Sequence, residues 1–216
     1  MGGAVFIVLA LLWELTISPS PWLVVWFAPL VVVGGFLPGP ANQVTLARAY
    51  LAAPAFIYAR DPHGLGLLAV TVAVAGVTDL ADGTVARRFQ QPSSIGGALD
   101  PVVDGLFFGA VGVGLWLGAA YPGWLAGVVA LRYAIPALAG AVLLAAGRNP
   151  ELRHTFFGQL STTLIGVLLG GVALVRGLGQ DPSPVVHAGE VLIPILTVLT
   201  FANLALAARA RPQQSG

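Results

Sequence analysis

Apolar segments close to the length of a bilayer-spanning helix make up most of this chain, and they rule out most soluble folds. A spanning helix needs about 20 residues. Hydrophobic residues make up 57% of the 216 residues and charged residues only 9%, whereas soluble domains carry about 25% charged residues. The apolar segments run over residues 4–17, 22–37, 44–59, 65–86, 97–119, 123–147, 155–175 and 187–208. The sequence therefore predicts an all-α integral membrane protein.

Short stretches of turn-forming residues separate these segments. Pro19-Ser20-Pro21 and Tyr121-Pro122-Gly123 are examples, and Pro and Gly of this kind mark loops. From residue 44 onward the pattern predicts a six-helix core bundle. We expect residues 38–211 to form one transmembrane domain, with residues 1–37 as an N-terminal hydrophobic extension of one or two further helices. The N-terminus lacks the basic region of a signal peptide, so we expect the extension to be retained.

The arginines predict how the bundle is oriented. Under this segmentation six arginines fall in alternate loops on one side, and only Arg60 and Arg176 fall on the other. Cytoplasmic loops carry the excess of basic residues, so the first side is expected to be cytoplasmic. The six are Arg87, Arg88, Arg148, Arg153, Arg209 and Arg211. Because the net charge is only +1, nothing in the composition suggests binding to nucleic acid.

Four of the nine acidic residues fall within 26 positions, at Asp79, Asp82, Asp100 and Asp104. Spacings of three and four place each pair on one face of a helix. Acidic groups are costly in a membrane and usually functional there. Four carboxylates brought together would repel one another, and bound divalent cations would relieve this repulsion. Acids in a membrane also suit the ion pathway of a transporter. The chain has no Cys, which excludes thiolate metal sites.

The residues around these aspartates resemble a known signature. The segment fits D-x2-D-G-x2-A-R-x8-G-x3-D-x3-D at every fixed position: Asp79, Asp82, Gly83, Ala86, Arg87, Gly96, Asp100 and Asp104. This pattern is similar to that of the CDP-alcohol phosphotransferases, membrane enzymes of phospholipid synthesis with a six-helix core. Upstream, Asn42, Thr45 and Arg48 match the N-x2-T-x2-R that opens the first core helix of that family.

The resemblance implies a role for each residue. Asp79, Asp82 and Asp100 resemble ligands of two divalent ions, Mg²⁺ or Mn²⁺. Asp104 resembles the base that takes the proton of the attacking alcohol, and it can also touch the second metal. The CDP-linked lipid, such as CDP-diacylglycerol, would lie against the residues Asn42, Thr45, Gly83, Ala86 and Arg87. Family members commonly form homodimers, which we therefore expect here.

The alcohol acceptor is less well determined by the sequence. Arg132 lies in the middle of an apolar helix, where it can bind an acceptor phosphate or pair with an acid or with backbone carbonyls. Arg148 and Arg153, at the expected cytoplasmic mouth, are further acceptor candidates. Many family members carry a lysine where this chain has Gln159, which removes an expected cation. Glycerol 3-phosphate is the leading acceptor, with inositol phosphate or another alcohol as alternatives. A transporter and an inactive scaffold remain alternatives of other classes.

Overall fold

The structure is a computed structural model of the chain, and it describes residues 2–17, 20–37, 39–89, 94–145 and 156–209. Within these ranges it describes side chains except those at 2, 41, 79–89, 94–98, 140–141, 143–145, 156–157, 159 and 207–209. Most of the described residues are helical, and none of them lies in a strand. The helices are α1 (Gly2–Leu12), a π-helical turn η1 (Trp13–Ile17), α2 (Pro21–Phe36), α3 (Pro40–Arg60), α4 (Leu65–Phe89), α5 (Ser94–Leu117), α6 (Gly123–Ala145), α7 (Phe156–Gly177) and α8 (Ser183–Arg209). The all-α prediction is confirmed.

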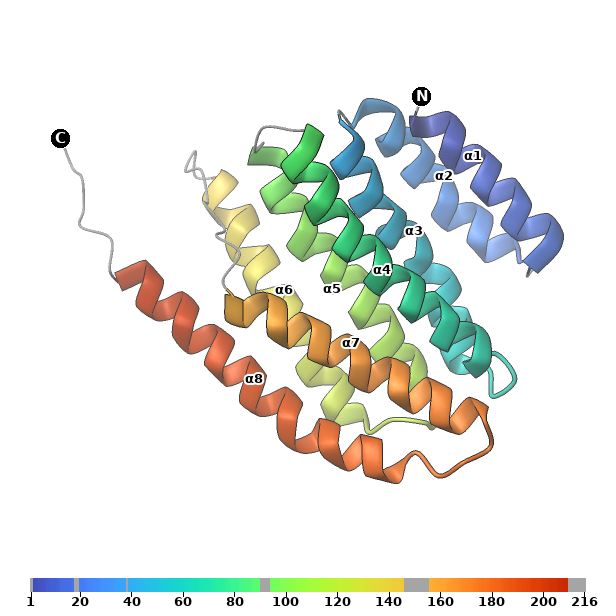
Figure 1. Cartoon of the computed structure of the whole chain (residues 1–216), viewed down its shortest axis with the longest axis vertical. Coiled ribbons are helices and arrows are strands. Elements are labelled where there is room, and N and C mark those ends of the chain that lie inside the picture. The colour runs from blue at the N-terminus through green and yellow to red at the C-terminus, as the bar shows by residue number, and fades with distance from the viewer. Residues whose placement is uncertain (1, 18–19, 38, 90–93, 146–155, 210–216) are drawn as a thin grey trace.

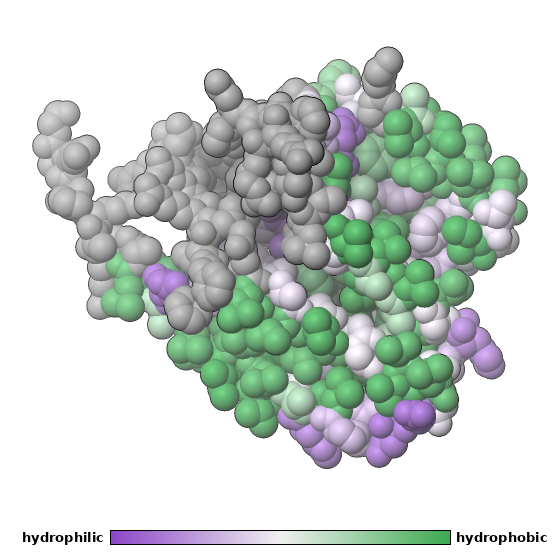
Figure 2. Space-filling view, viewed as in Figure 1, coloured by the Kyte–Doolittle hydropathy of each residue, from purple (hydrophilic) through white to green (hydrophobic). Residues whose placement is uncertain are grey.

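The surface of the bundle is apolar. Among the described residues, three stretches are long and apolar enough to cross a membrane: Leu99–Leu117, Leu160–Gly177 and Ser183–Leu206. Hydrophobic side chains cover most of the described surface in view, and hydrophilic ones gather mainly at its lower edge (Figure 2). Val167 and Val198, for example, are 64% and 66% exposed. Such exposure indicates that hydrocarbon, rather than water, surrounds this surface.

Successive helices alternate in direction along the bundle (Figure 1). Helix α3 packs against both α4 and α5, α5 packs against α6, and α7 packs against α4 and α8. The helices α1 and α2 pack against each other, and α2 lies against the outer side of α3. The α3–α4 and α4–α5 connections lie at opposite ends of the bundle. Arg60, the last residue of α3, and Arg87, in the last turn of α4, therefore lie at opposite ends.

Side-chain hydrogen bonds hold η1 and α2 on α3. The indole nitrogen of Trp26 donates to the Ala49 carbonyl at 3.0 Å, and that of Trp13 donates to the Tyr58 hydroxyl at 2.9 Å. The Gln43 amide donates to the carbonyls of Gly34 and Leu37, at 2.7 and 2.8 Å. Carbonyls at a helix C-terminus have no partner within the helix, so Gln43 satisfies two groups at the end of α2.

Glycines let the core helices approach closely. A Cβ atom at Gly114 of α5 would lie 2.6 Å from the Cβ of Ala59 on α3. One at Gly105 of α5 would lie 2.9 Å from the Cβ of Tyr133 on α6. Such contacts are too short for any side chain, so these positions set the spacing of α5 from both neighbours.

Candidate active site

Three buried polar side chains line one face of α3 near its N-terminal end. Asn42, Thr45 and Arg48 recur every three residues and are 4%, 4% and 2% exposed. Residues three apart are neighbours on a helix surface, so they form a continuous polar stripe. Burying polar groups in a membrane protein is costly unless each has a partner. The partners of this stripe include two of the predicted site residues on α5.

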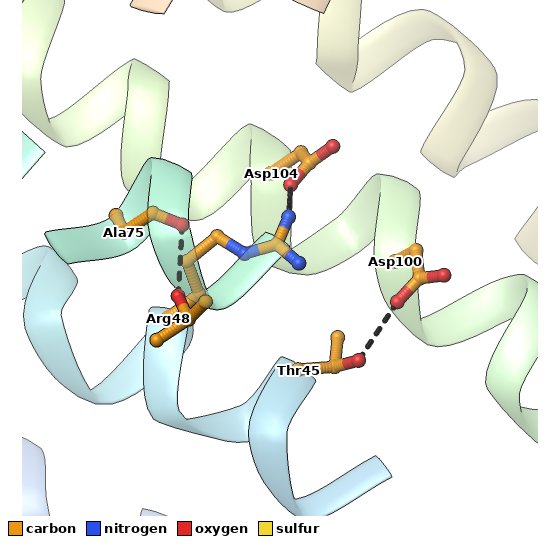
Figure 3. Close-up of polar contacts among 6 residues, drawn as sticks. Thr45, Arg48, Ala75, Asp100 and Asp104 are labelled. Atoms are coloured by element: carbon orange, nitrogen blue, oxygen red, sulfur yellow. Dashed lines mark hydrogen bonds and ion pairs between the residues drawn. The ribbon is translucent and has the colours of Figure 1, made fainter. Parts of the chain in front are cut away.

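The two aspartates of α5 meet this stripe. The Thr45 hydroxyl donates to a carboxylate oxygen of Asp100 at 3.0 Å, and the Arg48 guanidinium forms an ion pair with Asp104 (Figure 3). The side chain of Asp104 is 16% exposed, and Asp100 is half-buried. Asp100 and Asp104 lie one turn apart on the same face of α5. The structure therefore joins the predicted residues Thr45, Asp100 and Asp104 in one site.

The other half of the predicted site lies on α4. Asp79, Asp82, Gly83, Ala86 and Arg87 are all in its C-terminal part, and their side chains lie outside the described residues. Helix α4 ends at Phe89 and α5 begins at Ser94 at the same end of the bundle. Seven residues separate Asp82 from Phe89, and six separate Ser94 from Asp100, so both aspartates lie about 9–11 Å along their helices. That all four carboxylates converge remains a prediction.

The described half of the site has the chemistry of a hard-cation site. Asp100 and Asp104 offer carboxylate oxygens, and Mg²⁺ and Mn²⁺ prefer oxygen ligands. No cluster of three or more His, Asp or Glu side chains occurs where the structure describes side chains. A complete ligand set would therefore need Asp79 and Asp82. In such a site Asp100 would be the metal ligand, and the hydrogen bond from the Thr45 hydroxyl would orient its carboxylate.

Arg48 is a site residue whose role the sequence left unassigned. The sequence indicates it only as the last member of the α3 motif, and the ion pair with Asp104 shows what it contacts. The position of Arg48 inside an apolar helix could have indicated an ion pair, because a buried arginine needs an acidic partner. The pairing sets the positive charge of Arg48 against the negative charge of Asp104 inside the bundle.

Arg132 lies in a separate polar cluster between α6, α7 and α8. It is 4% exposed and donates to the Thr200 hydroxyl at 2.9 Å, to the Leu196 carbonyl at 3.3 Å and to the Ser161 hydroxyl. Its guanidinium also lies 5.6 Å from the centre of the Tyr133 ring. Two of these hydrogen-bond partners are hydroxyls and one is a backbone carbonyl, and the binding of an acceptor phosphate by Arg132 remains a prediction. Arg148 and Arg153 lie outside the described residues.

A hollow of about 520 Å³ opens at the other end of the bundle, beside the α5–α6 and α7–α8 connections. Arg176, Asp181 and His187 are among its lining residues, and Arg176 donates to the Ala119 carbonyl at 2.8 Å. None of the predicted site residues lines it. Burial, followed by the nearby Glu190 carboxylate, raises the pKa of Tyr121 in this lining. The hollow is therefore not the predicted catalytic site.

Comparison with known proteins agrees with the signature. The family model of CDP-alcohol phosphatidyltransferase matches residues 40–206. A probable cardiolipin synthase (CMP-forming) of Drosophila melanogaster is 32% identical over 62% of this chain and 44% of its own length. A putative cardiolipin synthase of Mycobacterium tuberculosis is 32% identical over 63% of this chain and 64% of its own. A probable phosphatidylglycerophosphate synthase of the same species is 27% identical over 77% of this chain and 81% of its own.

This chain thus spans less than two thirds of the length of the cardiolipin synthases named here. No solved structure matches. The match of the family model covers most of the chain, including α3, which carries the polar stripe, and α5, which carries Asp100 and Asp104. The chain belongs to the CDP-alcohol phosphatidyltransferase family.

Proposed function

We propose that the protein transfers a phosphatidyl group from a CDP-linked lipid, such as CDP-diacylglycerol, to a hydroxyl of a glycerol phosphate, releasing CMP. The observation that carries the proposal is the pairing of Thr45 with Asp100 and of Arg48 with Asp104. It joins the α3 motif to the second half of the aspartate signature, in a chain whose family acts on CDP-alcohols.

In this mechanism Asp79, Asp82 and Asp100 would hold two divalent ions, Mg²⁺ or Mn²⁺, with Asp104 as a further ligand. Such ions would supply positive charge to neutralise the pyrophosphate of the donor. Asp104 accepts the proton of the acceptor hydroxyl as its oxygen bonds to the lipid-side phosphorus. The bond from that phosphorus to the bridging oxygen breaks, and CMP leaves with the bonding electrons.

The remaining residues bind the donor. Gly83 and Ala86 allow the nucleotide close to α4, and Arg87 pairs with phosphate oxygens. Asn42 and Thr45 border the nucleotide on the side of α3. Arg48 holds the Asp104 carboxylate in position between turnovers, where it can act as the general base.

The acceptor proposal rests on the names of the relatives. Cardiolipin and phosphatidylglycerophosphate both carry a phosphatidyl group on a glycerol hydroxyl, so their synthases share a glycerol phosphate unit in the acceptor. Glycerol 3-phosphate and phosphatidylglycerol both contain this unit. Arg132, Arg148 and Arg153 are the cations that we propose for its phosphate. Arg132 would exchange its Ser161 or Thr200 contact for a phosphate oxygen.

We also propose the membrane arrangement that this chemistry needs. Helices α3 to α8 form the six-helix core of a domain at 38–211, and α1 and α2 form an extension at 1–37. All cross or enter the cytoplasmic membrane, with the aspartates facing the cytoplasm and a second copy of the chain completing a homodimer. The arginine distribution supports this orientation.

The test is CMP release by the purified protein from CDP-diacylglycerol with Mg²⁺ or Mn²⁺. Separate reactions receive glycerol 3-phosphate, phosphatidylglycerol or inositol phosphate, and the lipid product is identified in each. We expect product with one of the two glycerol acceptors and none after chelation. Full activity under exhaustive chelation would refute the metal mechanism. Solute flux in proteoliposomes without nucleotide would instead favour the transporter.

A further inference from the structure

An apolar hollow of about 240 Å³ lies between η1 and the helices α3 and α4. Its lining includes Trp13 and Ile17 of η1, Tyr58 of α3, and Val70 and Val74 of α4. An apolar protein cavity of about 150 Å³ is enough to hold benzene. The hollow is therefore large enough for a segment of a hydrocarbon chain, and too small for a whole lipid.

The polar groups of the lining are occupied within the protein. The Tyr58 hydroxyl accepts from the Trp13 indole at 2.9 Å, and the Thr71 hydroxyl donates to the Leu67 carbonyl of its own helix at 2.7 Å. What remains to face the hollow is hydrocarbon, so a polar ligand would lose its hydration without gaining a partner. The hollow therefore selects an apolar occupant.

The hollow lies along α4 on the side of Asp79 that is farther from the α4–α5 connection. Val74 is five residues from Asp79 and Leu67 is twelve, so the hollow spans about 7–18 Å from the level of Asp79 at 1.5 Å per residue. Position 82 is eleven residues from Thr71, about three turns, which places both on one face of α4. A lipid phosphate held at the aspartates would also lie about 10 Å below the cytoplasmic end of α4. Its chains would then reach deeper than those of the surrounding lipid.

We propose that this hollow binds the distal part of one acyl chain of the lipid donor, an inference that rests on the proposed transferase function. Between the phosphate and the chain lie the glycerol and ester groups, which occupy the first part of the distance along α4. The Trp13–Tyr58 hydrogen bond positions η1 as the outer wall. The N-terminal segment thereby takes part in recognising donor chain length, although it lies outside the matched family region.

Photolabelling tests the site without turnover. The full chain in nanodiscs receives CDP-diacylglycerol that carries a diazirine near the end of one chain, and labelled peptides are mapped. We expect label within 13–17 and 67–74, displaced by unlabelled CDP-diacylglycerol and not by phosphatidylcholine. Equal displacement by both lipids, or label confined to other regions, would overturn the proposal, because the hollow would then hold ordinary bilayer lipid or none.

Filling the hollow gives a second test. Val70→Trp should lower kcat/KM roughly tenfold for a dioleoyl donor through KM, since displacing about two methylene groups costs that much affinity. A dihexanoyl donor is too short to reach Val70, and its kcat/KM should change less than about twofold. Val167→Trp is the matched control, because Val167 is 64% exposed on α7 and Val70 is 61% exposed. Equal losses with both donors would contradict chain binding.

The two proposals fail separately. If the wild-type protein releases no CMP from either donor but the specific photolabel persists in the hollow, the transferase function fails and the acyl-chain site stands. If both donors react and Val70→Trp behaves as Val167→Trp does, the hollow is not used and the transferase function stands.

Discussion

At the residue scale, Asp104 is the group on which the proposed chemistry depends most. Asp104→Asn keeps an oxygen that can accept from Arg48 but removes the proton acceptor. We expect CMP release to fall roughly a hundred- to ten-thousandfold, the usual contribution of a general base. The assay is initial rate at saturating donor and metal, with thermal unfolding to confirm that the bundle is intact. Asp181→Asn is the control, since Asp181 lies at the opposite end. Comparable losses in both variants would exclude a specific role for Asp104.

A substitution at Thr45 tests whether the hydrogen bond from Thr45 to Asp100 supports metal binding. Thr45→Val keeps the shape of the side chain and removes the 3.0 Å hydrogen bond to Asp100. Because such partners orient metal ligands, we expect about a 10–100-fold higher Mg²⁺ or Mn²⁺ concentration for half-maximal rate. The matched control is Thr197→Val, whose buried hydroxyl donates within α8, to the Ile193 carbonyl at 2.7 Å. An unchanged metal dependence in Thr45→Val would show that Asp100 needs no such support.

At the scale of elements, close packing of α5 on α3 brings Asp100 and Asp104 against the polar stripe of α3. Gly114→Ala would place a Cβ 2.6 Å from that of Ala59, and we expect overpacking to cost about 1–3 kcal/mol. Gly109→Ala on the same helix meets nothing within 4 Å and should stabilise by about 0.5–1 kcal/mol, as alanine does in helices. Thermal unfolding in detergent compares them. Equal shifts in the two variants would mean that α5 and α3 are not held at this distance.

The helices themselves were largely predictable, because hydrocarbon length and turn residues limit where they begin and end. The predicted span at 123–147 corresponds to α6 at Gly123–Ala145, and that at 187–208 to α8 at Ser183–Arg209. Prolines such as Pro101 and Pro136 lie inside helices and would have suggested breaks in a soluble protein. Membrane helices tolerate them, since neighbouring helices and local adjustments satisfy the freed carbonyls.

The site was predictable only in part. The signature selected Asp100 and Asp104, the upstream motif selected Thr45, and the structure brings the three together. The contacts of Arg132 were beyond the sequence, because Ser161 and Thr200 are 29 and 68 residues away and their approach depends on how α7 and α8 cross α6. The partner of Arg48 was likewise 56 residues away on α5. Residue type indicates that a buried cation needs a partner, and only tertiary packing decides which one it has.

At the scale of the whole molecule, the arginine distribution makes a prediction about orientation. The sequence predicts six arginines on the side of the bundle that carries the α4–α5 connection, and Arg60 and Arg176 on the other. A bias of this kind places the first end in the cytoplasm. We therefore expect the aspartates to open to the cytoplasm, as proposed above.

The absence of cysteine from the sequence makes this orientation directly measurable. His63 lies in the α3–α4 turn with its side chain 97% exposed, and Arg88 lies in the last turn of α4. We expect a membrane-impermeant maleimide to label His63→Cys in intact cells, and Arg88→Cys only after permeabilisation. The Cys-free parent controls for background, and retained CMP release shows that each variant is inserted natively. The reverse pattern would place the aspartates on the outer side and would refute the proposed cytoplasmic orientation.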